Sequence, residues 1–267
     1  MGRLTCASAA FLFLMLGCRD RMPAAAPPVP SACVDSPDPH AAASRLGDPS
    51  WPVRERATSD LLTMGEAALP TVREAASSPD AEVRWRARWL LSAMPAPVDG
   101  GERSGTLAQS ETWRGTVRIR GAVVVPAEVA LAIDPGCRVV ATGDGCRLVV
   151  EGTLVAHGTA EAPIELAPEG ASWEGIQVRG EGASASLRRC RVRAARMGAY
   201  CLRGRVMIEE CEFVDSTWGV YLNRPAGGLV RGCSFRGVAT PIGLPEPCPG
   251  VLFEGNRADG QSPLAGR

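Results

Sequence analysis

From about Trp113 onward, the chain consists of short apolar strings that are separated by glycines and polar residues. Strings of this length, rich in Val, Ile and Leu, favour short β-strands, and glycines at their ends favour sharp corners. No helical period is present in this part of the chain. The pattern therefore predicts a coil that turns every few residues, with strands at Thr116–Ile119, Val123–Val125, Ala130–Ile133, Arg147–Val150, Thr153–Val155, Pro163–Leu166 and Ile176–Val178.

A repeat of 21 to 23 residues runs through the C-terminal half of this region. Aligning the repeats places four residues at one position: Cys190, Cys211, Cys233 and Asn256. Identical positions in successive coils of a parallel β-helix stack about 4.8 Å apart. We expect this column to face the interior, while the Arg, Glu and Ser residues between its members point to solvent.

Three segments resemble the opening coils of bacterial surface β-helix proteins: VPAEVALAIDPGCRV (125–139), LVVEGTLVAHGTAEAPI (148–164) and WEGI (173–176). The resemblance is to the right-handed parallel β-helix superfamily that includes the pectin lyase-like proteins. It implies a mainly β fold, a right-handed parallel β-helix of about four to six coils over residues 113–267. It says little about function, because this scaffold serves enzymes, adhesins and proteins of unknown role.

Residues 40–95 carry a helical pattern instead. Two segments 30 residues apart, 49–57 and 79–87, share Val, two Arg and Ala at equivalent positions. They resemble the second helix of HEAT-type repeats, which implies a small all-α HEAT-like module before the β-helix. Trp85 and Trp89 are four residues apart, so we expect them to form one apolar face while the neighbouring arginines are solvated or paired with acids.

The N-terminus predicts export. One arginine, an apolar run and the string LMLGC (14–18) resemble a bacterial lipobox, so residues 1–17 are predicted to be a lipoprotein signal peptide and Cys18 the lipidated residue. The alternative is an ordinary secretory signal with an incidental cysteine. Residues 18–39, rich in Pro and Ala, are predicted to be a linker. Residues 96–112, rich in glycine and poor in large apolar groups, are predicted to be a second linker.

Charge argues against one class of partner. The 29 basic residues, all of them arginine, are balanced by 29 acidic residues. A neutral chain has no long-range attraction for nucleic acid, and we expect no nucleic-acid partner. Together with the lipobox, this predicts a membrane-anchored lipoprotein of the bacterial cell envelope that faces the periplasm or the exterior, or else a secreted protein.

The cysteine column allows three interpretations. Stacked cysteines lie within disulfide reach, although bridge geometry is demanding. A metal site lacks the usual C-x-x-C pair or a Cys–His cluster, and we predict none. The interpretation that we favour is a ladder of small buried thiols, interchangeable with Asn256. An oxidising compartment keeps the disulfide alternative open.

No catalytic set and no cofactor site is evident. The densest acidic cluster, Glu209, Glu210, Glu212 and Asp215, follows an arginine cluster by one coil, and mutual surface pairing is the favoured explanation. His40 and His157 have no Ser, Cys or Asp partner at a recognisable spacing. A candidate ligand surface for carbohydrate stacking consists of Trp218, Tyr221 and Asn223.

Three hypotheses on function follow. The first is a non-catalytic envelope lipoprotein whose β-helix binds a partner protein or a surface glycan. The second is a polysaccharide-active lyase or hydrolase of the pectin lyase-like group, which requires acids beside arginine in an exposed groove. The third is a structural spacer, which binds nothing beyond the membrane.

Overall fold

The computed structural model describes residues 38–94 and 96–259. The predicted signal peptide, the predicted lipidation site Cys18 and most of the predicted first linker lie outside these residues. The described helices are α1 (Pro39–Ala43), α2 (Trp51–Met64), the 3₁₀ turn η1 (Gly65–Ala68), α3 (Leu69–Ala75) and α4 (Ala81–Ala93). The helices and the strands that follow belong to one compact unit.

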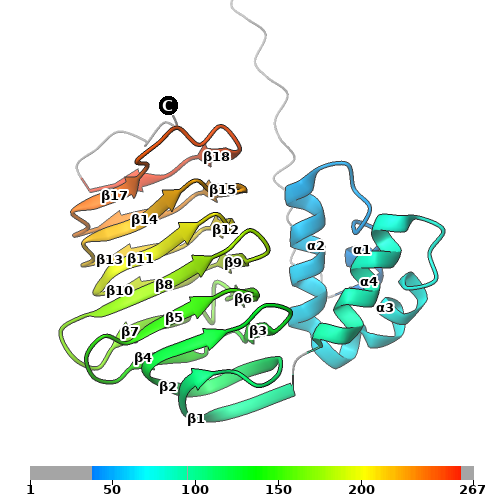
Figure 1. The fold of residues 1–267 in the computed structure, drawn as a ribbon, viewed down its shortest axis with the longest axis horizontal. Helices are drawn as coiled ribbons and strands as arrows, with labels where there is room; N and C mark the ends of the chain where they lie inside the picture. Colours follow the sequence, from blue (N-terminus) through cyan, green and yellow to red (C-terminus); the bar gives the residue numbers. More distant parts are fainter. Residues whose placement is uncertain (1–37, 95, 260–267) are drawn as a thin grey trace, which may run out of the picture. The chain divides into compact units, whose positions relative to one another are not determined.

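The remainder is a parallel β-solenoid of about seven turns, slightly more than the four to six coils predicted. Its strands stack into three faces (Figure 1). Face A contains β3 (Ala130–Ile133), β6 (Thr153–His157), β9 (Ser184–Arg188), β12 (Arg205–Glu209), β15 (Gly227–Arg231) and β18 (Val251–Glu254). Face B contains β4 (Arg138–Ala141), β7 (Ile164–Pro168), β10 (Cys190–Arg193), β13 (Glu212–Val214), β16 (Ser234–Arg236) and β19 (Arg257–Ala258). Face C contains β5 (Arg147–Val150), β8 (Trp173–Arg179), β11 (Ala195–Leu202), β14 (Trp218–Asn223) and β17 (Thr240–Gly243).

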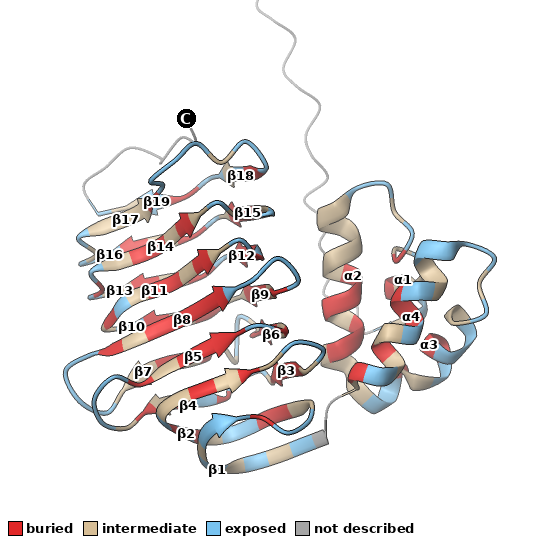
Figure 2. Ribbon diagram, viewed as in Figure 1, coloured by how far each residue is buried: buried red, intermediate tan, exposed pale blue. Residues whose placement is uncertain are grey.

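The mainly β prediction, with a parallel coil and a small helical module before it, is confirmed. Alternate residues of each strand point inward and form one continuous apolar core, which is visible as buried positions along the strands (Figure 2). Leu154, Ala185 and Val206 are successive inward residues of face A, and they are buried. The period-2 alternation of a strand therefore explains why short apolar strings are sufficient to build this core.

The corner between faces A and B explains the recurring tripeptides of the repeat. The residue before each column member has a positive φ: Arg189 (49°), Glu210 (52°), Gly232 (63°) and Gly255 (62°). This left-handed conformation turns the chain sharply from one strand to the next. Two of the four corners use glycine, which adopts this conformation without steric cost.

The structure differs from the sequence prediction at residues 96–112. Strand β1 (Ala96–Thr106) pairs in parallel with β2 (Glu111–Val125) and follows all three faces, where the sequence predicts a linker. Most side chains of β1 are exposed, and its register breaks near Gly101 and Gly105. Backbone pairing with β2 holds this end coil in place. The coil therefore does not need the alternation of apolar and polar side chains that marks the other strands.

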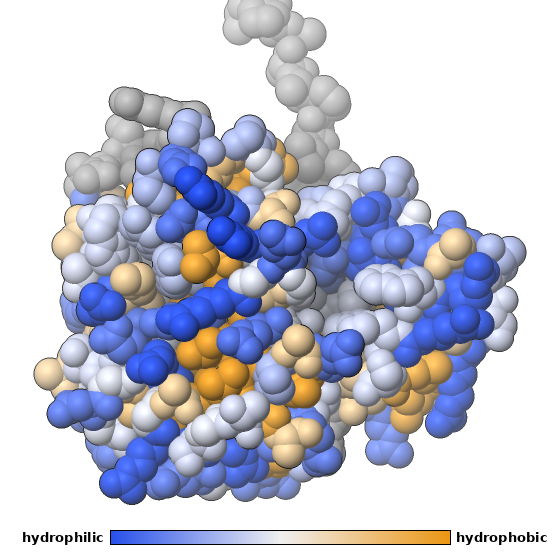
Figure 3. All heavy atoms as spheres, in the orientation of Figure 1, coloured by the Kyte–Doolittle hydropathy of each residue, from blue (hydrophilic) through white to orange (hydrophobic). Residues whose placement is uncertain are grey.

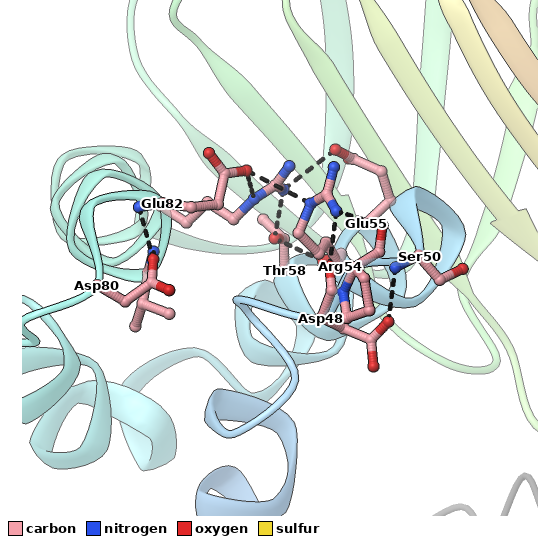
Figure 4. Close-up of polar contacts among 10 residues, drawn as sticks. Asp48, Ser50, Arg54, Glu55, Thr58, Asp80 and Glu82 are labelled. Atoms are coloured by element: carbon pink, nitrogen blue, oxygen red, sulfur yellow. Dashed lines mark hydrogen bonds and ion pairs between the residues drawn. The ribbon is translucent and has the colours of Figure 1, made fainter.

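The two helical segments of the 30-residue repeat begin in the same way. Nη1 of Arg54 donates to the carbonyls of Asp48 and Pro49, at 2.6 and 3.0 Å (Figure 4). Nη1 of Arg84 donates to the carbonyls of Ser78 and Pro79, at 2.6 and 3.2 Å. The shared arginine therefore fixes the chain at the N-terminus of α2 and of α4, which accounts for its recurrence.

Helix α2 packs on face A of the solenoid. Ala130 on β3 and Val155 on β6 belong to the same buried cluster as Leu61 and Leu62 of α2. This packing covers the outward side of these coils, so β3 is buried on both sides. Among the described helices, none has the length and apolar character that crossing a bilayer requires.

Candidate functional site

A cleft of about 490 Å³ lies where α2 and α4 meet face A and the adjacent corner of the solenoid. This volume falls within the range of small-ligand sites. Its lining combines aromatic, acidic, hydroxyl and arginine side chains. The aromatic and charged residues are Trp51, Trp85, Trp89, Glu55, Glu128, Glu151, Glu181, Arg86 and Arg205, and the hydroxyl residues are Thr58, Ser59, Thr153, Ser184 and Ser186.

The tryptophans give the cleft its apolar surface. Trp85 and Trp89 share one side of α4, as their spacing predicts, and both line the cleft. Trp85 is 61% exposed, which makes it the most exposed large apolar side chain of the described residues. Arg205 lies over the ring of Trp51, with Cζ 5.8 Å from the centroid, in the range of a cation–π contact. The cleft thus offers one open ring and one ring that is paired with a cation.

Arg86 fixes the two helices that form one wall. It is 6% exposed, and its Nη1 donates to Glu55 at 3.1 Å and to Thr58 at 3.0 Å. Its Nε donates to Glu82 at 2.7 Å. The acceptors Glu55, Thr58 and Glu82 converge from α2 and α4 in Figure 4. One buried guanidinium therefore joins α2, which carries Trp51, to α4, which carries Trp85 and Trp89.

Behind the wall of the cleft lies a buried polar group that sequence reasoning missed. His157 Nε2 on β6 and Ser186 Oγ on β9 are 2.7 Å apart. His157 Nδ1 lies 3.5 Å from Asp60 Oδ1 on α2, a long contact that is not a well-formed hydrogen bond. His157 is 4% exposed and Ser186 is 8% exposed. The expectation that His157 lacks a Ser or Asp partner is therefore wrong, because the coil and the helix bring together residues far apart in sequence.

The surroundings of His157 set its charge. Burial lowers the pKa of the imidazole below its ordinary value and outweighs the carboxylates of Asp60 and Glu209, which raise it. Arg188, whose guanidinium lies 3.9 Å from Asp60, lowers the pKa further. The ring is therefore neutral near pH 7, and one of its nitrogens is able to accept a proton.

The predicted column residues lie at equivalent positions of four successive coils. Each is buried, with an exposed fraction of 2% or less. The thiol of Cys190 donates to the carbonyl of Ala156 at 3.2 Å, and Asn256 Nδ2 donates to the carbonyl of Val230 at 2.8 Å. Both side chains thus pair with a backbone carbonyl near the corner of the preceding coil. The column is structural, and its cysteines are free thiols in the described chain.

Trp218 and Tyr221 on β14 touch each other, with ring centroids 4.9 Å apart in an edge-on arrangement. Tyr221 also lies 5.7 Å from Tyr200 on the preceding coil. Asn223 ends the same strand and is partly exposed. These residues lie on face C, whereas the cleft lies on face A, so the structure does not bring the predicted platform to the cleft.

Figure 3 shows the surface of the molecule in the orientation of Figure 1. On the solenoid, hydrophobic residues gather on the side turned to the viewer, with hydrophilic residues around them.

Three residues of the predicted acidic cluster, Glu209, Glu210 and Glu212, form ion pairs. Arg189 pairs with Glu210 at 2.8 Å, and Arg191 and Arg236 both pair with Glu212. Glu209 instead points to face A, where it binds Arg56 and Arg231. The expected surface pairing between coils is therefore present, and the paired carboxylates of face B are not arranged as an acid–base couple.

No group of three or more metal-ligating side chains occurs within residues 38–94 and 96–259. No family model matches the chain, and neither a curated protein nor a solved structure matches it. The cleft and its buried polar group are therefore interpreted from their chemistry alone.

Proposed function

We propose that this protein is a cell-envelope lipoprotein that binds a glycan in the cleft between the helices and face A. The observation that carries the proposal is the composition of the cleft wall. Trp85 presents an open indole beside carboxylates, hydroxyls and Arg205. Sugar rings pack their C–H faces on aromatic rings and direct their hydroxyls toward such polar groups.

The anchoring part of the proposal rests on the sequence. A lipid on Cys18 and a Pro-rich spacer would hold the binding cleft close to the membrane but clear of its surface. The HEAT-like character of the helical pair and membership of the pectin lyase-like superfamily are part of the same proposal. In this arrangement the helices supply the aromatic wall and the solenoid supplies the polar floor.

The alternatives have less support. A partner protein fits a concave cleft less well than a short oligosaccharide does. A lyase or hydrolase site on face B is disfavoured because Glu165, Glu210 and Glu212 are each paired with arginine. A structural spacer does not account for a tryptophan that is 61% exposed at a cleft.

Titration calorimetry of the purified chain against a panel of neutral and acidic polysaccharides, with and without calcium, tests the proposal. At least one glycan is expected to bind, and Trp85→Ala is expected to weaken it about tenfold, as for an aromatic hot spot. Leu252→Ala, which removes another exposed apolar side chain away from the cleft, is the control and is expected to bind normally. Trp218→Ala tests the alternative site, the aromatic platform on face C. Weakened binding by this variant would place the glycan on face C. Binding to no glycan, or unchanged binding by Trp85→Ala, would contradict the proposal.

A further inference from the structure

Ser186 is exceptional in its position on face A. The outward residues that neighbour it in register are Val155 on β6 and Met207 on β12. Both are apolar and buried. Ser186 is therefore a polar residue among apolar neighbours, and it lines the cleft. Its hydroxyl lies 2.7 Å from Nε2 of a buried histidine.

The other nitrogen of the histidine ring faces the helix. His157 Nδ1 faces Asp60 at 3.5 Å, so the order along the group is carboxylate, Nδ1, Nε2, hydroxyl. This is the order of nucleophile, base and carboxylate in hydrolytic triads, with the carboxylate at a longer distance from the base than a hydrogen bond allows. Ser186 is a residue of the cleft lining, while the histidine and the aspartate are not part of it. A substrate in the cleft would meet the serine first.

We infer that Ser186, His157 and Asp60 form a hydrolytic site that removes an acyl group, such as acetate, from an ester on a glycan held in the cleft. The substrate class rests on the proposed function, whereas the reactivity of Ser186 does not. Ser186 is the nucleophile, His157 is the base and Asp60 is a positioning residue. The site differs from the acid-based chemistry considered for face B, since it depends on one neutral imidazole.

The reaction balances with water as the only co-reactant. Ser186 Oγ attacks the acyl carbonyl carbon while His157 takes the hydroxyl proton, and the ester C–O bond breaks as that proton passes to the departing sugar oxygen. Water then attacks the acyl-serine and gives a proton to His157, which returns it to Ser186 Oγ as the carboxylic acid leaves. Arg205 lines the same cleft and is the cation available to the developing oxyanion.

Labelling with a fluorophosphonate probe tests the site without knowledge of the substrate. Mass spectrometry of the labelled full-length chain is expected to find the phosphonyl group on Ser186. Labelling is expected to be lost in Ser186→Ala and in His157→Gln. Ser234→Ala removes a hydroxyl on β16 of face B, away from the cleft, and it is expected to label normally.

Release of acetate from 4-nitrophenyl acetate provides the second measurement. Ser186→Ala is expected to lose about 10³-fold or more of the rate above buffer, as when the nucleophile of such a group is removed. Circular dichroism establishes that each variant is folded. A wild-type chain that is not labelled at Ser186 and hydrolyses no faster than Ser186→Ala would overturn the inference. Glycan binding that depends on Trp85 would still stand in that case, so the two proposals fail separately.

Discussion

Arg56 on α2 donates a hydrogen bond to the carboxylate of Glu209 on β12, although 153 positions separate the two residues. The side chain of Glu209 is only 4% exposed, and it also accepts a hydrogen bond from Arg231 on the next coil. One buried carboxylate thus joins the helical module to two turns of the solenoid. This contact adds to the apolar packing of α2 on face A, which forms one wall of the cleft.

Removing the negative charge of Glu209 is therefore expected to lower the free energy of unfolding. In Glu209→Gln, Arg56 and Arg231 keep their positive charges but lose the carboxylate between them. Breaking a buried ion pair on one side costs about 3–5 kcal/mol, because the remaining charge stays desolvated. Urea unfolding followed by circular dichroism should show a loss of this order.

Glu210→Gln provides a matched control one residue later. Glu210 pairs with Arg189, but its side chain is 50% exposed, and exposed pairs contribute about 0–1 kcal/mol. The same chemical change should therefore have little effect there. Equal losses in the two variants would show that Glu209 does not join the helices to the solenoid.

Much of the fold could be predicted from the sequence because a solenoid repeats its physical requirements. Each coil needs an inward apolar residue, a corner and a small buried side chain. Residues of the column therefore recur at a regular spacing in the sequence: Cys190, Cys211, Cys233 and Asn256. The strings from Thr116 to Val178 correspond to strands for the same reason. Strand β1 escaped prediction because backbone pairing with β2 holds it, and backbone pairing leaves no side-chain period.

The candidate site could not be predicted in this way. His157 and Ser186 lie on neighbouring coils but 29 residues apart, since this turn is longer than the later repeats. Asp60 comes from a helix whose packing on face A is not encoded in any local pattern. A polar residue at an outward position of an otherwise apolar column is the signal that could have drawn attention to Ser186, once the register of face A was known.

Gly219 is expected to be intolerant of a side chain. A Cβ at this position would lie 2.5 Å from Cε1 of Phe235 and 2.5 Å from the carbonyl oxygen of Pro241. Phe235 stacks on Phe213 with centroids 5.3 Å apart inside the core, so it has little room to move. Gly219→Ala should destabilise the protein by about 1–3 kcal/mol, the usual cost of overpacking a core.

Gly170→Ala is the control for this prediction. A Cβ at Gly170 would meet nothing within 4 Å, and the residue is exposed. Its effect on the free energy of unfolding should stay within about 0.5 kcal/mol. A thermal melt of both variants distinguishes the two positions, and a neutral Gly219→Ala would mean that the phenylalanine stack is not tightly packed.

The buried thiols are expected to resist alkylation. Burial raises the pKa of Cys137 and of Cys201 to about 12, and burial also raises the pKa of Cys211 well above its ordinary value. Because the thiolate is the reactive form, iodoacetamide at about pH 8 should modify the partly exposed Cys248 first among the seven described cysteines. Peptide mass spectrometry before and after guanidinium unfolding measures this order. Modification of Cys211 at the rate of Cys248 in the folded protein would contradict it.

The stability of the protein is expected to fall as the pH is lowered from about 7 to about 5. Burial lowers the pKa of His157, whose ring faces Asp60, Arg188 and Glu209, so the unfolded chain binds a proton in this range before the folded chain does. Proton uptake by the unfolded state alone favours unfolding, by an amount on the order of 1 kcal/mol. His157→Gln should remove this part of the dependence. Since the chain has only two histidines, His40→Gln is the natural control and should retain it. Urea unfolding at both pH values measures the difference, and an identical loss in wild type and His157→Gln would refute a neutral buried imidazole.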